Sequence, residues 1–365
     1  MNENWKVAIG AVLAGGLLAV AGIAPPPAAA VVDGERVAAR DAPWAVAMGH
    51  MYRGRWAHAC SATAIGPRRL LTARHCVDED SMWKTIVATQ TDDPGRAPGR
   101  RVKVARVWVP TLEGLFKANR AIHSDLAVVE TAQELGVPAL PLVAAGFVGA
   151  PEEPVWAYGF GNTDPEEEGQ VGPSLLRRAA MLLYTRAQCA ESDFGYVPTA
   201  LCAHRVEGPG GGILASGDSG GGLVRQGAGG FELLGVNSTG SRGLIGSSAS
   251  GFASVPALHA FVTAPERGIE VPFPVGRALL KGEARVGEHV RCEARWSVPV
   301  RQVRVRWTAT RRGARDLYSS SGPAPWKVPA SVKGRRLTCA VSGMLTRDMY
   351  YGSQTDPSRA VEVKR

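Results

Sequence analysis

The 365-residue sequence lacks several patterns that mark particular classes of protein. It has no internal repeat, no long low-complexity tract and no repeated alternation of strand-like and helical segments, so a parallel α/β sheet is not indicated. None of its six cysteines stands in a C-x-x-C pair, the spacing typical of metal sites. Charged residues make up only 21% of the chain, whereas 44 glycines and 25 prolines are present. This composition favours a turn-rich globular β protein.

The chain also begins with an apolar run that is too short for a typical membrane span. The run from Val7 to Ile23 covers about 17 residues and is interrupted by glycines, whereas a spanning helix needs about 20. Lys6 precedes the run, and Ala28 and Ala30 follow it in an A-x-A pattern. These features predict an export signal at residues 1–30 and a secreted protein, with a membrane anchor as the alternative.

The length favours two domains after this signal, since 365 residues exceed one average domain. Residues 31 to about 263 contain short apolar runs with period-two alternation, broken by glycine and proline, which predicts an antiparallel barrel or sandwich. Residues 256–262 have helical spacing and could form a closing helix. Breaks at residues 264–268 and 272–274 divide the chain into domains at 31–268 and 269–365.

Three short segments place a histidine, an aspartate and a serine in distinctive local sequences. His75 lies in TARHC, Asp125 opens the apolar stretch DLAVV, and Ser219 is the centre of GDSGG. An unpaired carboxylate at the head of a buried strand is costly, and a facing histidine removes that cost. Glycines around a serine let the backbone turn tightly and present the hydroxyl together with neighbouring amides.

In the order His, Asp, Ser, these segments resemble the signature segments of the trypsin and chymotrypsin family of secreted serine proteases. The resemblance covers about residues 31–263 and implies an all-β fold of two barrels and hydrolysis of peptide bonds in proteins through an acyl-enzyme. It implies that Ser219 is the nucleophile, His75 the general base and Asp125 the residue that orients the histidine. The amides of Gly217 and Ser219 would form the oxyanion hole. No metal or organic cofactor is expected.

The resemblance also assigns roles to residues around this triad. Asp218 would pair with the new ammonium group of Val31 once the chain is cut after Ala30, either by signal cleavage or by a second protease. Ser238 would donate a hydrogen bond to Asp125. The primary specificity pocket would have Ile213 at its base and glycines in its walls, which predicts an apolar substrate side chain. These two wall positions are Gly240 and Gly251.

The same family pattern implies two disulfides in this region, Cys60 with Cys76 and Cys189 with Cys202. Three positions depart from the pattern: Asp33 replaces a usual glycine, Ala215 a frequent cysteine and Gly222 a usual proline. None of these belongs to the triad. The remaining histidines match no role in the pattern: His50, His58, His123, His204, His259 and His289.

The C-terminal part has a different sequence character. Apolar and charged residues alternate around Cys292, Val305, Trp307 and Cys339, so that the cysteines and the tryptophan share inward faces. This pattern predicts a small immunoglobulin-like sandwich with Trp307 packed against a Cys292–Cys339 disulfide.

Positive charge is also concentrated there. Residues 277–365 contain 19 Lys and Arg against 7 Asp and Glu, a net charge of +12. Two interpretations remain open, namely a solubilising surface or a surface that binds anionic polymers such as acidic polysaccharides. Nothing indicates base-specific recognition of nucleic acid.

Two other functions are compatible with parts of the sequence. GDSGG also satisfies the G-x-S-x-G pattern of α/β hydrolases, but that fold requires an acid and then a histidine after the serine, on alternating strands and helices. A non-catalytic binding protein on a protease scaffold is the second alternative, and an intact His75, Asp125 and Ser219 set argues against it.

Overall fold

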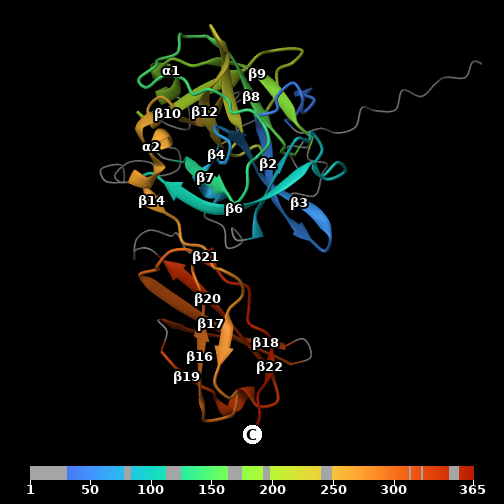
Figure 1. Cartoon of the computed structure of the whole chain (residues 1–365), viewed down its shortest axis with the longest axis vertical. Coiled ribbons are helices and arrows are strands. Elements are labelled where there is room, and N and C mark those ends of the chain that lie inside the picture. Colours follow the sequence, from blue (N-terminus) through green and yellow to red (C-terminus); the bar gives the residue numbers. More distant parts are fainter. Residues whose placement is uncertain are drawn as a thin grey trace, which may run out of the picture.

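The computed structural model describes residues 31–77, 84–111, 125–162, 175–191, 198–239, 249–311, 314–321, 324–344 and 353–365. The expected export signal at residues 1–30 and the expected wall residue Gly240 lie outside the described residues. The described part is built almost entirely of antiparallel strands, as expected, arranged as two adjoining barrels and a smaller two-sheet unit (Figure 1).

The first barrel has six strands. Its sheet runs in the order β6-β5-β2-β3-β4-β7 and closes because β6 also pairs with β7. Consecutive residues of β2, β3, β4 and β7 are buried, rather than every second residue as the period-two pattern predicts, and Val, Leu and Ala fill the interior. The strands are β2 (Ala45–Tyr52), β3 (Arg55–Ala64), β4 (Arg69–Thr72), β5 (Ile86–Thr89), β6 (Arg100–Val109) and β7 (Ala127–Thr131).

The second barrel repeats this plan with its own six strands. Its order is β9-β10-β13-β12-β11-β8, closed by pairing of β8 with β9, and the short β1 (Glu35–Arg36) adds to β9 at the edge. The strands are β8 (Pro154–Gly159), β9 (Arg177–Leu183), β10 (Ala200–Arg205), β11 (Gly222–Gly227), β12 (Gly230–Thr239) and β13 (Ala249–Ser254).

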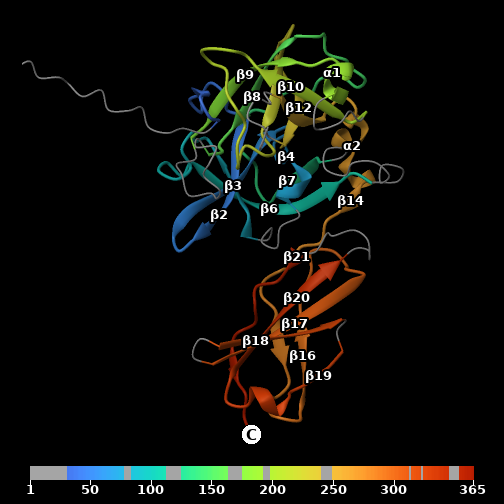
Figure 2. The same ribbon diagram turned by 180° about the vertical axis from the view of Figure 1, so that it is seen from behind.

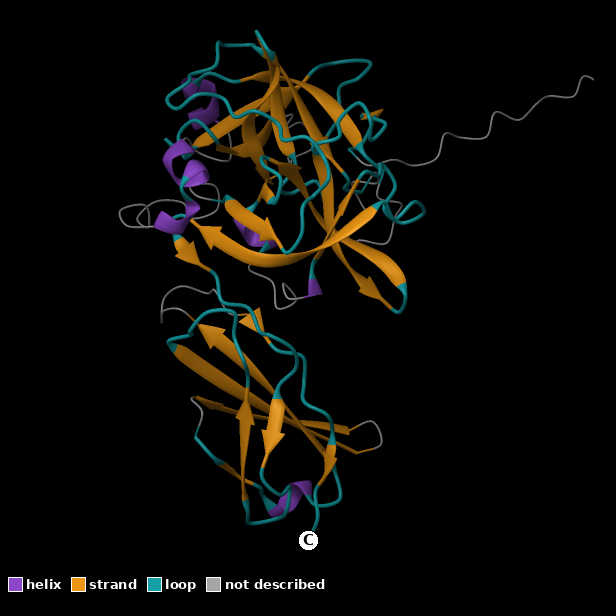
Figure 3. Cartoon of the chain, in the orientation of Figure 1, coloured by secondary structure: helices purple, strands orange, loops and turns teal. Residues whose placement is uncertain are grey.

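The two barrels share an apolar interface. One buried cluster includes Leu70 and Val129 from the first barrel together with Leu233 and Val236 from the second. Helices are few in the described residues: α1 (Arg186–Glu191), α2 (His259–Thr263) and short 3₁₀ turns (Figure 3). None of the described helices is long and apolar enough to cross a membrane.

The segment after α2 is tied to the first barrel rather than forming a free linker. Strand β14 (Ile269–Glu270) pairs with β6, and Val271 and Phe273 are buried in the apolar cluster of the barrels. Phe273 also forms two hydrogen bonds with Ser297: its amide donates to the Ser297 hydroxyl at 3.1 Å, and its carbonyl accepts from the Ser297 amide at 2.9 Å. The expected boundary at 268/269 therefore precedes a strand of the first barrel, and we propose a boundary after Pro274.

The C-terminal unit is a sandwich of two sheets, seen from both sides in Figures 1 and 2. A disulfide between Cys292 and Cys339 joins β16 in one sheet to β20 in the other, and Trp307 lies fully buried directly across from Cys339. One sheet consists of β15 (Leu279–Lys281), β16 (His289–Glu293) and β19 (Trp326–Lys327). The other consists of β17 (Gln302–Arg311), β18 (Ala314–Ser321), β20 (Arg336–Met344), β21 (Ser353–Gln354) and β22 (Val361–Glu362).

Candidate active site

Strand pairing brings His75 and Asp125 together. His75 lies in a 3₁₀ turn just after β4, and Asp125 lies just before β7. Because β4 and β7 are antiparallel neighbours with Thr72 opposite Ala127, the residue after one strand faces the residue before the other. His75 and Asp125 are therefore in direct contact although they lie 50 residues apart in the sequence.

The Asp125 carboxylate accepts three hydrogen bonds. His75 Nδ1 donates to Oδ2 at 2.8 Å, the His75 backbone amide donates to Oδ1 at 2.8 Å, and the Ser238 hydroxyl donates to Oδ2 at 2.6 Å. The Asp125 side chain is only 8% exposed, so these donors replace the water that a carboxylate requires. With its Nδ1 proton held by Asp125, the imidazole presents Nε2 as an acceptor.

The loop between β10 and β11 places Ser219 against Cys76, the residue that follows His75. The Ser219 carbonyl accepts from the Ser61 amide at 2.8 Å and lies 3.7 Å from Cys76 Sγ. Gly220, with φ of +83°, packs so closely that a Cβ would lie 2.1 Å from Thr72 Oγ1. Glycine is therefore required at position 220 for the serine loop to lie against the end of β4.

Gly217 is held in a conformation that only glycine adopts easily. Its φ is +93°, and a Cβ would lie 2.9 Å from the His58 ring. Its carbonyl accepts from His58 Nε2 at 3.0 Å and from Ser61 Oγ at 2.9 Å. In the described part of the chain, neither the Gly217 amide nor the Ser219 amide donates a hydrogen bond. Both donors are therefore free for a ligand.

His58 is a residue that the sequence did not single out. It is 4% exposed, and burial lowers its pKa to about 4, although its hydrogen bond to Gly217 acts in the opposite direction. The imidazole is thus neutral at pH 7, with Nε2–H donating to Gly217 and Nδ1 left without a partner among the described residues. His58 lies two residues before Cys60, which forms a disulfide with Cys76, the neighbour of His75. This position was the one sequence signal that His58 lies near the site.

Asp218 is fully buried, and burial raises the pKa of its carboxyl group to about 7. The amides of Gly161 and Ala215 donate to it at 2.8 and 2.9 Å, which partly offsets that rise. Among the described hydrogen bonds none joins Asp218 to its expected partner Val31, whose amide here belongs to a peptide bond.

The segment that begins at Val31 nevertheless docks near the serine loop. Val31 is fully buried, and Val32 and Ile213 exchange backbone hydrogen bonds of 3.0 and 2.9 Å. Ile213, the expected base of the specificity pocket, is half-buried. Gly251, the described wall residue, pairs with Thr239 across β12 and β13.

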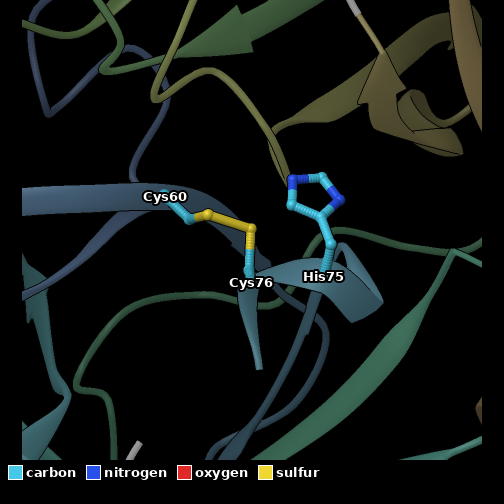
Figure 4. Close-up of side chains that lie close together, drawn as sticks. All are labelled: Cys60, His75 and Cys76. Carbon is cyan, nitrogen blue, oxygen red and sulfur yellow. A yellow bond between two sulfur atoms is a disulfide. The ribbon is translucent and has the colours of Figure 1, made fainter. Parts of the chain in front are cut away.

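The expected cysteine pairs are present, namely Cys60–Cys76, Cys189–Cys202 and Cys292–Cys339. Cys60, His75 and Cys76 gather within 4.8 Å of one another, which superficially resembles a metal site. Figure 4 shows the two sulfurs bonded to each other beside the imidazole. Because metal ions bind thiolates, these disulfide sulfurs are not metal ligands.

Comparison with known proteins places this geometry in a family. The family model described as Trypsin matches residues 31–262. Chymotrypsin-like elastase family member 1 of Felis catus is 29% identical over 212 residues, covering 55% of this chain and 76% of the relative. Chymotrypsin-C of Rattus norvegicus is 25% identical over 226 residues, covering 58% of this chain and 78% of the relative.

A solved structure matches the two barrels as well. The scabies mite inactivated protease paralogue S-I1 aligns with a TM-score of 0.52 and 19% identity, covering 64% of this chain and 98% of that chain. At this identity the likeness establishes the chymotrypsin-like fold alone. That protein is described as inactivated, so activity has to be argued from the residues of the present chain.

Proposed function

Because this chain belongs to the trypsin family and is a trypsin- or chymotrypsin-like serine endopeptidase, we propose that His75, Asp125 and Ser219 form its catalytic triad. The hydrogen bond of 2.8 Å between His75 Nδ1 and Asp125 Oδ2, beside the Ser219 loop, is the observation that carries this proposal. Protein substrates follow from the family.

In this mechanism His75 Nε2 takes the proton of Ser219 Oγ as the hydroxyl attacks the scissile carbonyl. Asp125 keeps the imidazole in the required tautomer and stabilises the imidazolium that forms. The developing oxyanion accepts hydrogen bonds from the Gly217 and Ser219 amides, each worth on the order of 3 kcal/mol at the transition state. His75 then donates its proton to the leaving amine, and water hydrolyses the acyl-enzyme by the reverse sequence.

A fluorophosphonate probe tests the triad without knowledge of the substrate. We expect labelling of Ser219 in the parent protein, loss of labelling in Ser219→Ala and strong reduction in His75→Ala. His289→Ala is the matched control, because His289 is an exposed histidine of the C-terminal unit. Absence of labelling in the parent protein would favour a non-catalytic scaffold instead.

We also propose that the protein is secreted and that it matures by cleavage before Val31. In the uncut chain Val31 has φ of +48°, which is strained for a β-branched residue by about 1–3 kcal/mol. Cleavage removes the preceding peptide unit and thereby this constraint. It also creates an ammonium group close to the segment that leads to Asp218, whose buried carboxylate has no cationic partner in the uncut chain among the described residues.

For the C-terminal unit we propose an immunoglobulin-like sandwich that binds anionic polymers. Arg304 and Arg306 are exposed on β17, and in the described residues neither forms a salt bridge. Their neighbours across β20 are Ser342 and Ala340, which carry no charge. An arginine face without acidic partners is available to attract polyanions, which would hold the protease near its substrate.

A further inference from the structure

The end of β12 carries two buried side-chain oxygen atoms that have no hydrogen-bond partner in the described part of the chain. Asn237 is 2% exposed, and its Oδ1 atom is buried without a hydrogen-bond partner. The buried Oγ1 atom of Thr239, two residues further, has none either. Within the described residues these two groups flank Ser238, whose hydroxyl bonds to Asp125.

Backbone hydrogen bonds fix Asn237 next to the proposed nucleophile. Its amide donates to Gly221 at 2.8 Å, and its carbonyl accepts from Gly220 at 2.7 Å, the residue directly after Ser219. Across the sheet, Asn237 faces Phe252 and Thr239 faces Gly251. Both unpaired groups therefore border the proposed substrate pocket, whose expected wall includes Gly251.

A buried polar group without a partner is destabilising, and native proteins rarely leave one uncompensated. Other buried polar groups near the serine loop are of two kinds: His58 Nδ1 and Thr63 Oγ1 also lack a partner among the described residues, whereas three neighbours are paired. Ser61 bonds to Gly217, Ser238 to Asp125, and Asp218 to two amides. Of these unpaired groups, Asn237 Oδ1 and Thr239 Oγ1 are the ones on the strand that pairs with Gly251, which indicates that a ligand in the proposed pocket supplies their missing partner.

The residues expected around the pocket limit which kind of substrate side chain could be the missing partner. Ile213 and Gly251, the expected base and the described wall of this pocket, are uncharged, so neither would supply a countercharge to a charged substrate side chain. A carboxamide both donates and accepts, and its best neutral complement is another carboxamide. We infer that Asn237, assisted by Thr239, selects substrates with glutamine or asparagine as the residue whose carbonyl Ser219 attacks. This inference rests on the proposed triad and replaces the apolar preference indicated by Ile213.

The test uses peptides that differ only at the residue on the acyl side of the cleaved bond. Glutamine is compared with methionine, which has a similar length and no hydrogen-bonding group, and with glutamate, leucine and phenylalanine. We expect kcat/KM for glutamine to exceed that for methionine by about tenfold or more, as the loss of a partner from a buried polar group implies. In Asn237→Val the ratio should fall to about one or reverse.

Asn237→Asp is the matched isosteric variant, because it introduces a carboxylate and should shift preference towards lysine and arginine. Fluorophosphonate labelling of Ser219 is measured in parallel for every protein. If the parent is labelled but cleaves methionine or leucine peptides as well as glutamine peptides, the inference fails while the triad stands. An unchanged glutamine-to-methionine ratio in Asn237→Val also overturns it. If the parent is not labelled, the triad fails first and the inference fails with it.

Discussion

The buried imidazole of His58 should make the stability of the folded protein depend on pH in the acidic range. Burial sets its pKa in the folded protein to about 4, below the ordinary value of 6.5. Between these two pH values the unfolded chain binds a proton that the folded chain excludes, so stability falls as the pH is lowered. The contribution is fully present above pH 6.5 and is lost as the pH approaches 4. Linkage gives a loss of about 3 kcal/mol between pH 7.5 and pH 4.

The comparison protein is His58→Gln, since the glutamine amide can still donate to the Gly217 carbonyl but does not titrate. Both proteins carry Ser219→Ala to prevent self-digestion. Denaturant unfolding at several pH values from 4 to 7.5 then gives the free energy of unfolding for each. Contributions shared by both proteins, including the opposite one from Asp218, cancel in the difference.

We expect the histidine protein to lose about 3 kcal/mol more stability than the glutamine protein over this range. The slope of the free energy of unfolding against denaturant concentration should be similar for the two proteins, which would show that both expose similar surface on unfolding. A difference below about 1 kcal/mol would mean that folded His58 takes up a proton near its ordinary pKa, and the interpretation of a buried neutral imidazole would be refuted.

Two further predictions address maturation and the C-terminal unit. Intact mass of the secreted protein should show Val31 as the first residue, and Asp218→Asn should lower kcat/KM by about tenfold or more while fluorophosphonate still labels Ser219; an active protein that begins upstream of Val31 contradicts this. A protein ending at Pro274 should cleave small peptides as the full chain does but lose salt-sensitive binding to heparin. The full chain with both Arg304→Glu and Arg306→Glu should lose heparin binding in the same way. Equal heparin binding by the full chain and both variants would mean that the arginines are solubilising charge only.

The residues that could be identified from the sequence are those whose neighbours in the chain carry the signal. His75, Asp125 and Ser219 each sit in a short segment with its own pattern of glycine, cysteine or apolar residues. Strand alternation around Trp307 and Cys339 likewise placed the sandwich core, because the period of two follows from backbone geometry alone.

The domain boundary was harder because proline and glycine mark a break in regular structure but not the side to which the next residues belong. Gly268 ends a 3₁₀ turn, yet Ile269 and Glu270 continue as a strand on β6. That pairing depends on residues about 160 positions away in the chain, around Trp108 and Val109. A local pattern contains no information about such a partner.

At the site itself, His58 and Asn237 also could not be identified from their local sequence. Each is a polar residue in a strand whose pattern is otherwise ordinary, and the significance of each depends on what lies across the fold. For His58 that is the Gly217 carbonyl, 159 residues away in the sequence. For Asn237 it is the lack of a partner for its Oδ1 atom among the described residues. Composition cannot reveal whether a buried polar atom is satisfied, because satisfaction is a property of the packed neighbours. The residues to which we assign the pH response and, by proposal, the substrate choice are therefore the ones for which the three-dimensional structure was needed.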